Sequence, residues 1–195
     1  MSDFIFYLLL LAFVQNLVLS TGLGASLLMR VTRRPKDILV YGATLCFFTV
    51  LSILASYPLD ALIGTSSIAK FLRPAMMILV AALLYLIVTP LIKRCLPQVY
   101  RRISYLIPLA AFNNMVIGLL LIINHQFSIS LPGALGIGVG ASVGFVLLSW
   151  VLVEGVDRLD NPDTPGAFRG LPGTLLYLSI LALALMGFGS HVSLI

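Results

Sequence analysis

The chain has 195 residues, of which 60% are hydrophobic and 10% are charged, and its mean hydropathy is +1.10. This composition excludes a water-soluble globular domain and indicates an all-α integral membrane protein, with residues 1–195 in a single membrane domain. The net charge of +5 is better explained by topology-setting charges at helix ends than by a nucleic-acid partner.

Six apolar runs are long enough to cross a bilayer, which takes about 20 residues. The predicted spans are residues 4–29, 38–59, 71–92, 103–124, 132–154 and 171–192. The first run follows MSD, which lacks the basic residues of a cleavable signal peptide, so we expect it to stay in the mature protein. The short loops leave almost no soluble mass.

Amide, glycine and proline residues stand out in the first and third predicted spans. The first carries two side-chain amides, Gln15 and Asn16, followed by Gly22 and Gly24. Glycine weakens a helix because its backbone loses the most freedom there, so this span is expected to be interrupted. The third span has Pro74 in its predicted first turn, where proline is tolerated.

The last three spans show related features. In the fourth, Pro108 precedes the amide pair Asn113 and Asn114, and the missing N–H of proline frees a carbonyl, so this helix is also expected to be interrupted. The fifth contains GALGIGVGASVG at 133–144, which we interpret as a surface for close helix packing and not for ligand contact. The sixth begins with Pro172 in its first turn.

The two halves of the chain match one another at a fixed offset of 98 residues. The matching pairs are QNLVL (15–19) with NNMVI (113–117), GATLCF (42–47) with GASVGF (140–145), and Pro74 with Pro172. Residues 1–98 and 99–195 are therefore expected to form two repeats of three helices. Because three is odd, the second repeat must enter the membrane from the opposite side, which makes this an inverted repeat.

Basic residues are concentrated in the loops after the first, third and fifth predicted spans. Of the 12 Lys and Arg residues, only Lys70 and Arg73 fall on the opposite side. By the positive-inside rule, the three basic loops face the cytoplasm. With six spans, both termini then lie outside the cytoplasm.

Inverted-repeat membrane proteins tend to have their functional centre near the midplane, where interrupted helices expose backbone groups to a protected cavity. We therefore expect a midplane site at the two interruptions. Its candidate residues are Gln15, Asn16, Gly22, Gly24, Ser26, Asn113 and Asn114. The alternative is that the amides only bind helices to one another, typically with about 0.6–2 kcal/mol each. The sequence leaves both interpretations open.

Residues suited to catalysis or metal binding are scarce. No Asp or Glu lies in the central part of a predicted span, so a carboxylate relay within this chain is not expected. Cys46 and Cys95 form no CxxC pair or disulfide pattern, and His125 and His191 have no second ligand at metal-binding spacing. Nucleotide-binding and nucleophile motifs are also lacking, so we predict no catalytic residue and no metal ligand.

Five motifs spread over the chain resemble those of the Rnf/Nqr small membrane subunits, closest to the RnfA and NqrE type. They are NLVLSTGLGASLLMRV (16–31), LPQVYRRISYLIPLAAFNNMVIG (96–118), GASVGF (140–145), DTPGAFRG (163–170) and LALMGFGS (183–190). The resemblance implies six helices in two inverted halves in the bacterial inner membrane, with both termini in the periplasm. It further implies a non-catalytic subunit of a complex that couples electron flow to sodium or proton transport.

The resemblance also implies a partner and a cofactor. Family members pair with a homologous subunit of opposite topology, RnfE or NqrD, and share an iron–sulfur cluster with it through one cysteine in helix one and one in helix four. Ser26 and Asn114 stand at those positions here, and neither side chain is an ordinary substitute for a thiolate. We therefore expect no cofactor to be bound by this chain itself.

Several roles are compatible with that departure. The chain could be a divergent complex subunit that keeps the scaffold and the ion path, a paralogue recruited to another membrane process, or a subunit whose partner supplies a different electron route. The alternative from another class is a small inverted-repeat secondary transporter that binds a polar solute or ion at the midplane.

Overall fold

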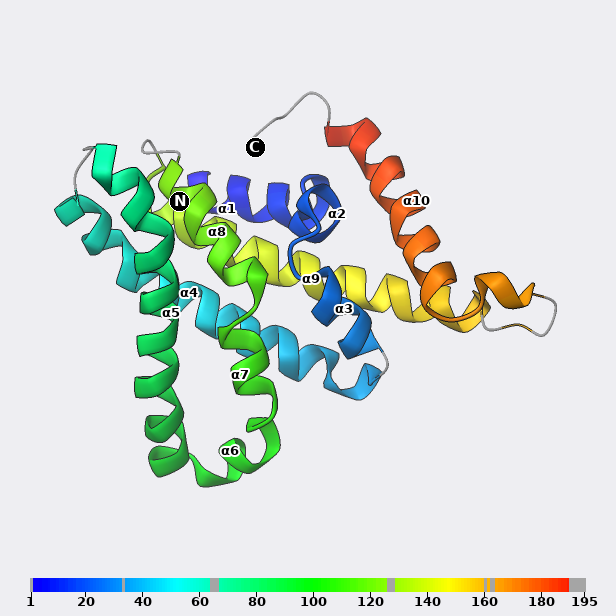
Figure 1. The fold of residues 1–195 in the computed structure, drawn as a ribbon, viewed down its shortest axis with the longest axis horizontal. Helices are drawn as coiled ribbons and strands as arrows, with labels where there is room; N and C mark the ends of the chain where they lie inside the picture. Colours follow the sequence, from blue (N-terminus) through cyan, green and yellow to red (C-terminus); the bar gives the residue numbers. More distant parts are fainter. Residues whose placement is uncertain are drawn as a thin grey trace.

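The computed structural model describes residues 2–32, 34–63, 67–125, 129–159, 161 and 164–189, and this part of the chain is helical almost throughout (Figure 1). Its α-helices are α1 (Ser2–Leu9), α2 (Leu17–Thr21), α3 (Ala25–Thr32), α4 (Ile38–Ile63), α5 (Ser67–Cys95), α6 (Pro97–Ile103), α7 (Leu106–Ala111), α8 (Asn114–His125), α9 (Leu131–Leu159) and α10 (Leu171–Gly189). A π-helical turn, η1, covers Leu10–Val14, and two 3-10 turns are η2 (Pro35–Asp37) and η3 (Gly166–Phe168).

Among the described residues, four helical stretches are long and apolar enough to cross a membrane, so the chain is a multi-pass membrane protein. They are Pro35–Leu59, Leu72–Cys95, Leu106–Ile123 and Leu131–Leu159, and they correspond to the second to fifth predicted spans. The outer two predicted spans contain shorter apolar helices, Ser2–Val14 and Leu171–Gly187. The sixth predicted span ends beyond the described residues, and His191 lies outside them.

The two aligned prolines occupy different helix positions. Pro172 is the second residue of α10, as expected for a first-turn proline. Pro74, however, lies inside α5, because that helix begins at Ser67 and not near residue 71. The first-turn prediction was therefore wrong for Pro74.

Helix α9 lies at the centre of the fold, and α1 runs along it (Figure 1). Glycines on α9 allow this approach: a Cβ at Gly136 would lie 2.4 Å from the carbonyl oxygen of Phe4, and one at Gly140 would lie 2.5 Å from that of Leu8. No side chain fits between the two backbones at these points. The close packing predicted for residues 133–144 is confirmed.

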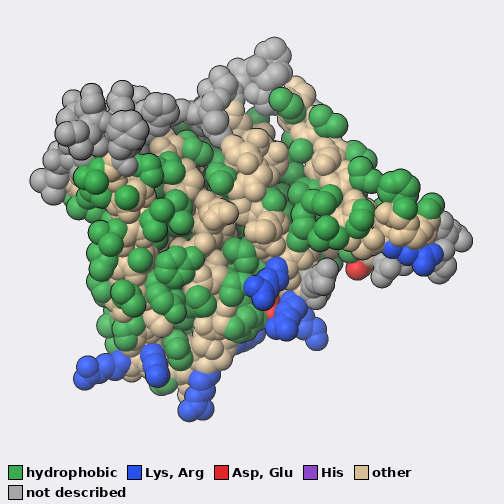
Figure 2. Space-filling model, in the orientation of Figure 1, with side chains coloured by type: hydrophobic (Ala, Val, Ile, Leu, Met, Phe, Trp, Pro, Cys, Tyr) green, Lys and Arg blue, Asp and Glu red, His purple; other side chains and the backbone are tan. Residues whose placement is uncertain are grey.

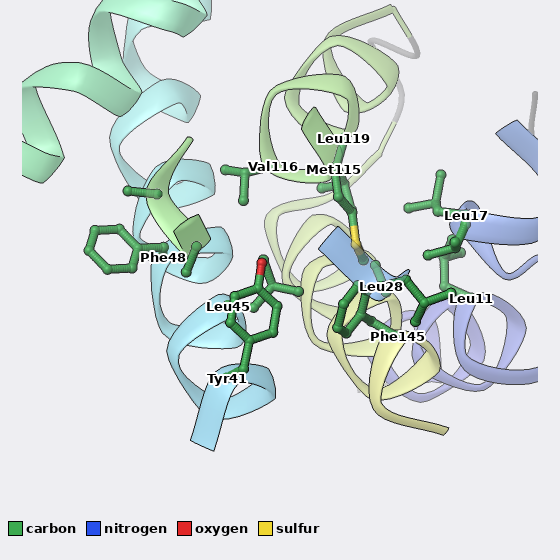
Figure 3. Packing of buried hydrophobic residues seen from close by; sticks show 14 of the residues in the cluster. Leu11, Leu17, Leu28, Tyr41, Leu45, Phe48, Met115, Val116, Leu119 and Phe145 are labelled. Carbon is green, nitrogen blue, oxygen red and sulfur yellow. The ribbon is translucent and has the colours of Figure 1, made fainter. Parts of the chain in front are cut away.

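Helices α4 and α9 cross in antiparallel directions. A Cβ on Gly42 of α4 would lie 2.1 Å from Val146, and one on Gly138 of α9 would lie 2.6 Å from Ile53. The hydrophobic core gathers around this crossing. Figure 3 shows members of this core, including Leu28 of α3, Tyr41 and Leu45 of α4, Met115 of α8 and Phe145 of α9.

Basic side chains collect along the lower and right-hand margins of the face shown in Figure 2. Basic residues occupy the last turns of α3, α5, α6 and α9, namely Arg30, Lys93, Arg94, Arg101, Arg102 and Arg158. Apolar side chains cover much of the remaining visible surface. This distribution is typical of a protein whose sides face lipid and whose basic end faces water.

Candidate functional site

The first predicted span is interrupted at Gln15 and Asn16, between the π-helical turn η1 and α2. Oδ1 of Asn16 accepts a hydrogen bond from the backbone N–H of Val18 at 3.0 Å, and its Nδ2 donates to the carbonyl oxygen of Gly144 in α9 at 2.8 Å. The residue is only 6% exposed. Asn16 therefore caps the start of α2 and ties it to α9.

The fourth predicted span is interrupted at Asn113, between α7 and α8. Oδ1 of Asn113 accepts a hydrogen bond from the N–H of Met115 at 3.0 Å, and its Nδ2 donates to the hydroxyl of Tyr41 in α4 at 3.0 Å. The residue is 0% exposed. Asn113 thus caps α8 and ties it to α4.

The hydroxyl of Tyr41 satisfies a backbone carbonyl group at the break in the fourth span. The backbone N–H of Asn113 turns to the carbonyl oxygen of Ala110 at 3.3 Å, which leaves the carbonyl oxygen of Leu109 without its helical partner. The Tyr41 hydroxyl donates to that oxygen at 3.3 Å. Pro108 instead lies in the first turn of α7, so the expected interruption is present but its predicted cause was wrong.

Asn16 and Asn113 are counterparts in their hydrogen bonding. Each accepts from the N–H two residues further on, and each reaches a long helix of the opposite half, at Gly144 for Asn16 and at Tyr41 for Asn113. The sequence offset of 98 pairs Asn16 with Asn114 instead, and the side chain of Asn114 is exposed. The capping residues are therefore shifted by one position relative to the sequence repeat.

The first span is interrupted again between α2 and α3, at Gly22 and Gly24, whose φ angles are 72° and 84°. This left-handed region strongly favours glycine. A Cβ at Gly24 would lie 3.4 Å from Oδ1 of Asn113, and the intervening Leu23 packs on Gly118, where a Cβ would lie 2.5 Å from its Cδ1. The interrupted segment of the first span therefore lies directly against the break in the fourth.

The seven candidate residues divide by burial. Asn16, Gly24 and Asn113 are buried, Gln15 is half-buried, and Gly22, Ser26 and Asn114 are exposed. Gly24 and Asn113 are brought into contact. Within the described residues, Oε1 of Gln15 is buried without a hydrogen-bond partner.

Tyr41 is the polar residue that sequence reasoning missed. It stands alone in an apolar run, and the residue aligned with it by the repeat is Val139, so neither the pattern nor the repeat marked it. Its ring is fully buried against Phe145, with the ring centroids 5.3 Å apart. A buried tyrosine hydroxyl usually has a partner, and that general expectation was the only available signal.

The donor set does not fit the iron–sulfur cluster that the family resemblance implies. Such clusters are held by thiolates, but Ser26 offers a hydroxyl and Asn114 an amide. Cys46 is half-buried within α4, and Cys95 is exposed at the end of α5. In the described part of the chain, no three His, Cys, Asp or Glu side chains gather where they could hold a metal ion.

Comparisons with known proteins connect this architecture to one family. Residues 4–192 match the family model described as "Rnf-Nqr subunit, membrane protein". A relative from Rhodobacter capsulatus is 33% identical over 193 residues, which is 98% of this chain and 99% of the relative. Relatives from Cereibacter sphaeroides (32% identical, 96% of this chain and 97% of the relative) and Actinobacillus pleuropneumoniae (28% identical, 100% of both) are also similar. The names of all three describe a component of an ion-translocating oxidoreductase complex.

Proposed function

Because the chain belongs to the Rnf-Nqr family of membrane subunits, we propose that it is a membrane subunit of an ion-translocating oxidoreductase complex. In this role it takes part in coupling electron flow to the transport of sodium or protons. The observation that carries the proposal is the similarity over nearly the full length of both chains to relatives of that name, at 33% identity over 98% of this chain.

We further propose six spans in two inverted repeats, 1–98 and 99–195, in the bacterial inner membrane with periplasmic termini. The crossed contacts support this arrangement: Asn16 in the first half binds α9 in the second, while Asn113 in the second half binds α4 in the first. Helices α4 and α9, which are equivalent in the repeat, also pack antiparallel. A twofold axis in the membrane plane would produce both features.

Within this fold we propose that the breaks in the first and fourth predicted spans form the midplane site. Gly24 and Asn113 lie in contact at its centre, and the side chains at the breaks supply polar atoms to an otherwise apolar region. Oε1 of Gln15, buried without a partner among the described residues, is one such atom. Broken helices of this kind are tolerated in membranes where protein or water covers them.

Ser26 and Asn114 mark the surface that we propose faces a homologous RnfE- or NqrD-like partner. Both are exposed in the isolated chain, and both adjoin the contact between Gly24 and Asn113. A polar amide facing lipid costs free energy, which a protein partner with hydrogen-bonding groups would relieve. Since neither residue offers sulfur, we propose that this chain contributes scaffold and ion route and no cluster ligand of its own.

The test is gentle purification of the tagged chain from its native membrane, followed by identification of the proteins and flavin that accompany it. Flavin-bearing partners and a homologous membrane subunit are expected. Asn114→Trp should release the homologous subunit, whereas Leu183→Trp, at a position of α10 that is 70% exposed, should retain it. A chain that purifies alone and moves solute into vesicles would overturn the proposal and favour the secondary transporter.

A further inference from the structure

A cavity of about 380 Å³ lies at the basic end of the molecule, between the end of α3, the turn η2 and the start of α7. Its lining residues are Arg30, Val31, Arg34, Asp37, Tyr105, Leu106 and Leu109. The volume is at the lower end of the range of about 300–1,000 Å³ that is usual for small-molecule sites.

The lining is divided into a charged part and an apolar part. Arg30, Arg34 and Tyr105 are exposed, whereas Val31 and Leu106 are buried, with 5% and 3% of their surface exposed. Charged groups therefore surround the opening, and apolar side chains lie deeper. A ligand that matches both parts is an anionic amphiphile.

The charged groups are held by contacts with Tyr105. The guanidinium carbon of Arg34 lies 5.9 Å from the centre of the Tyr105 ring, and the Tyr105 hydroxyl donates a hydrogen bond to Oδ2 of Asp37. Within the described residues, neither Arg30 nor Arg34 forms an ion pair with a carboxylate. The two guanidinium groups outnumber the single carboxylate of the lining, Asp37, and their forked geometry suits phosphate oxygens.

The position of the cavity identifies the source of that phosphate. The cavity opens where the spans Pro35–Leu59 and Leu106–Ile123 begin, which is the depth of lipid headgroups. A free phosphate ion would leave the apolar wall without contacts. We propose that the cavity binds the headgroup of one anionic phospholipid, with Arg30 and Arg34 on its phosphate and the apolar wall along its glycerol and first acyl carbons.

The test uses the full chain, with its partners, in vesicles of phosphatidylcholine and phosphatidylglycerol, and counts the lipids retained after detergent extraction by native mass spectrometry. We expect one phosphatidylglycerol to be retained in preference to phosphatidylcholine. Each arginine removed in Arg30→Gln and Arg34→Gln should lower this retention about fivefold. The matched control is the pair Arg101→Gln and Arg102→Gln, exposed on α6 outside the cavity, which should retain the lipid.

A second variant keeps both charges and fills the cavity. Leu109→Phe should lower retention of phosphatidylglycerol. If the arginine variants fail to fold, this variant still tests whether the lipid binds in the cavity. Equal retention of the two lipids by the unaltered chain, or equal losses in both arginine pairs, would overturn the proposal. Displacement of the lipid by millimolar inorganic phosphate would also overturn it, because the site would then recognise the free anion.

Discussion

Asn113 and Asn114 are neighbours with opposite surroundings, and they form a matched pair for mutation. Asn113 is buried and makes two hydrogen bonds at 3.0 Å, whereas Asn114 is exposed. Asn113→Ala should lower the free energy of unfolding by about 2–3 kcal/mol, because it removes a cap and leaves a buried N–H unpaired. Asn114→Ala should stay within about 0.5 kcal/mol. The measurement is SDS-driven unfolding of the purified chain in mixed micelles, and equal effects would refute the capping role.

Tyr41 and Asn113 should behave as one unit. Tyr41→Phe removes the hydroxyl that accepts from Asn113 and donates to the carbonyl oxygen of Leu109, and should cost about 1–2 kcal/mol. In a double-mutant cycle with Asn113→Ala, we expect a coupling of about 0.5–1 kcal/mol or more. Tyr57→Phe is the control, since Tyr57 is 43% exposed. Additive losses would show that the hydrogen bond between Asn113 and Tyr41 contributes no coupling free energy to stability.

At this scale the sequence could identify the amides but not their partners. Polar side chains within apolar runs are visible in any membrane sequence, which is why Asn16 and Asn113 were predicted. Which amide of each pair forms the cap depends on a register of one residue, and the offset of 98 did not encode it. Tyr41 could not be predicted because its role arises only where α4 meets the break.

Among the helices, the contact between α1 and α9 depends most directly on the absence of side chains. A Cβ at Gly140 would lie 2.5 Å from the carbonyl oxygen of Leu8, a backbone atom that cannot move away alone. Gly140→Ala should therefore cost about 1–3 kcal/mol through overpacking. Gly187→Ala in α10 is the control: a Cβ there meets nothing within 4 Å, so the change should be neutral or stabilise the helix by up to about 1 kcal/mol. The measurement is SDS-driven unfolding of both variants. A Gly140→Ala chain as stable as the Gly187→Ala chain would show that the glycine packing is unimportant.

The long apolar runs of the sequence are helical stretches in the structure. The second to fifth predicted spans are present because a long apolar run in lipid has few alternatives to a helix. The first span was harder, since it breaks twice and contains a π-helical turn at Leu10–Val14. The sequence LLAFV contains no feature that predicts that turn. Pro74 was misplaced because α5 extends further toward its N-terminus than the apolar run does.

For the molecule as a whole, charge was more informative than packing. The loops rich in Lys and Arg were found by counting residues, and Figure 2 shows basic side chains gathered along the lower and right-hand margins of the visible face. The crossed contacts between the halves could not be predicted, because a sequence repeat shows which helices are equivalent and not which ones touch. The binding of α9 by Asn16 and of α4 by Asn113 is such a contact pattern.

The proposed orientation predicts which side of the membrane each end of a helix can be reached from. Cys95 is exposed at the end of α5, whereas Cys46 is half-buried inside α4. A membrane-impermeant maleimide should therefore label Cys95 in inverted vesicles and not in right-side-out vesicles, and Cys95→Ser should abolish the signal. In that background, Ser2→Cys, at an exposed position, should be labelled only in right-side-out vesicles. If both positions were labelled from one side, α5 would end on the same side as the N-terminus, and the inverted arrangement of three-span repeats would be wrong.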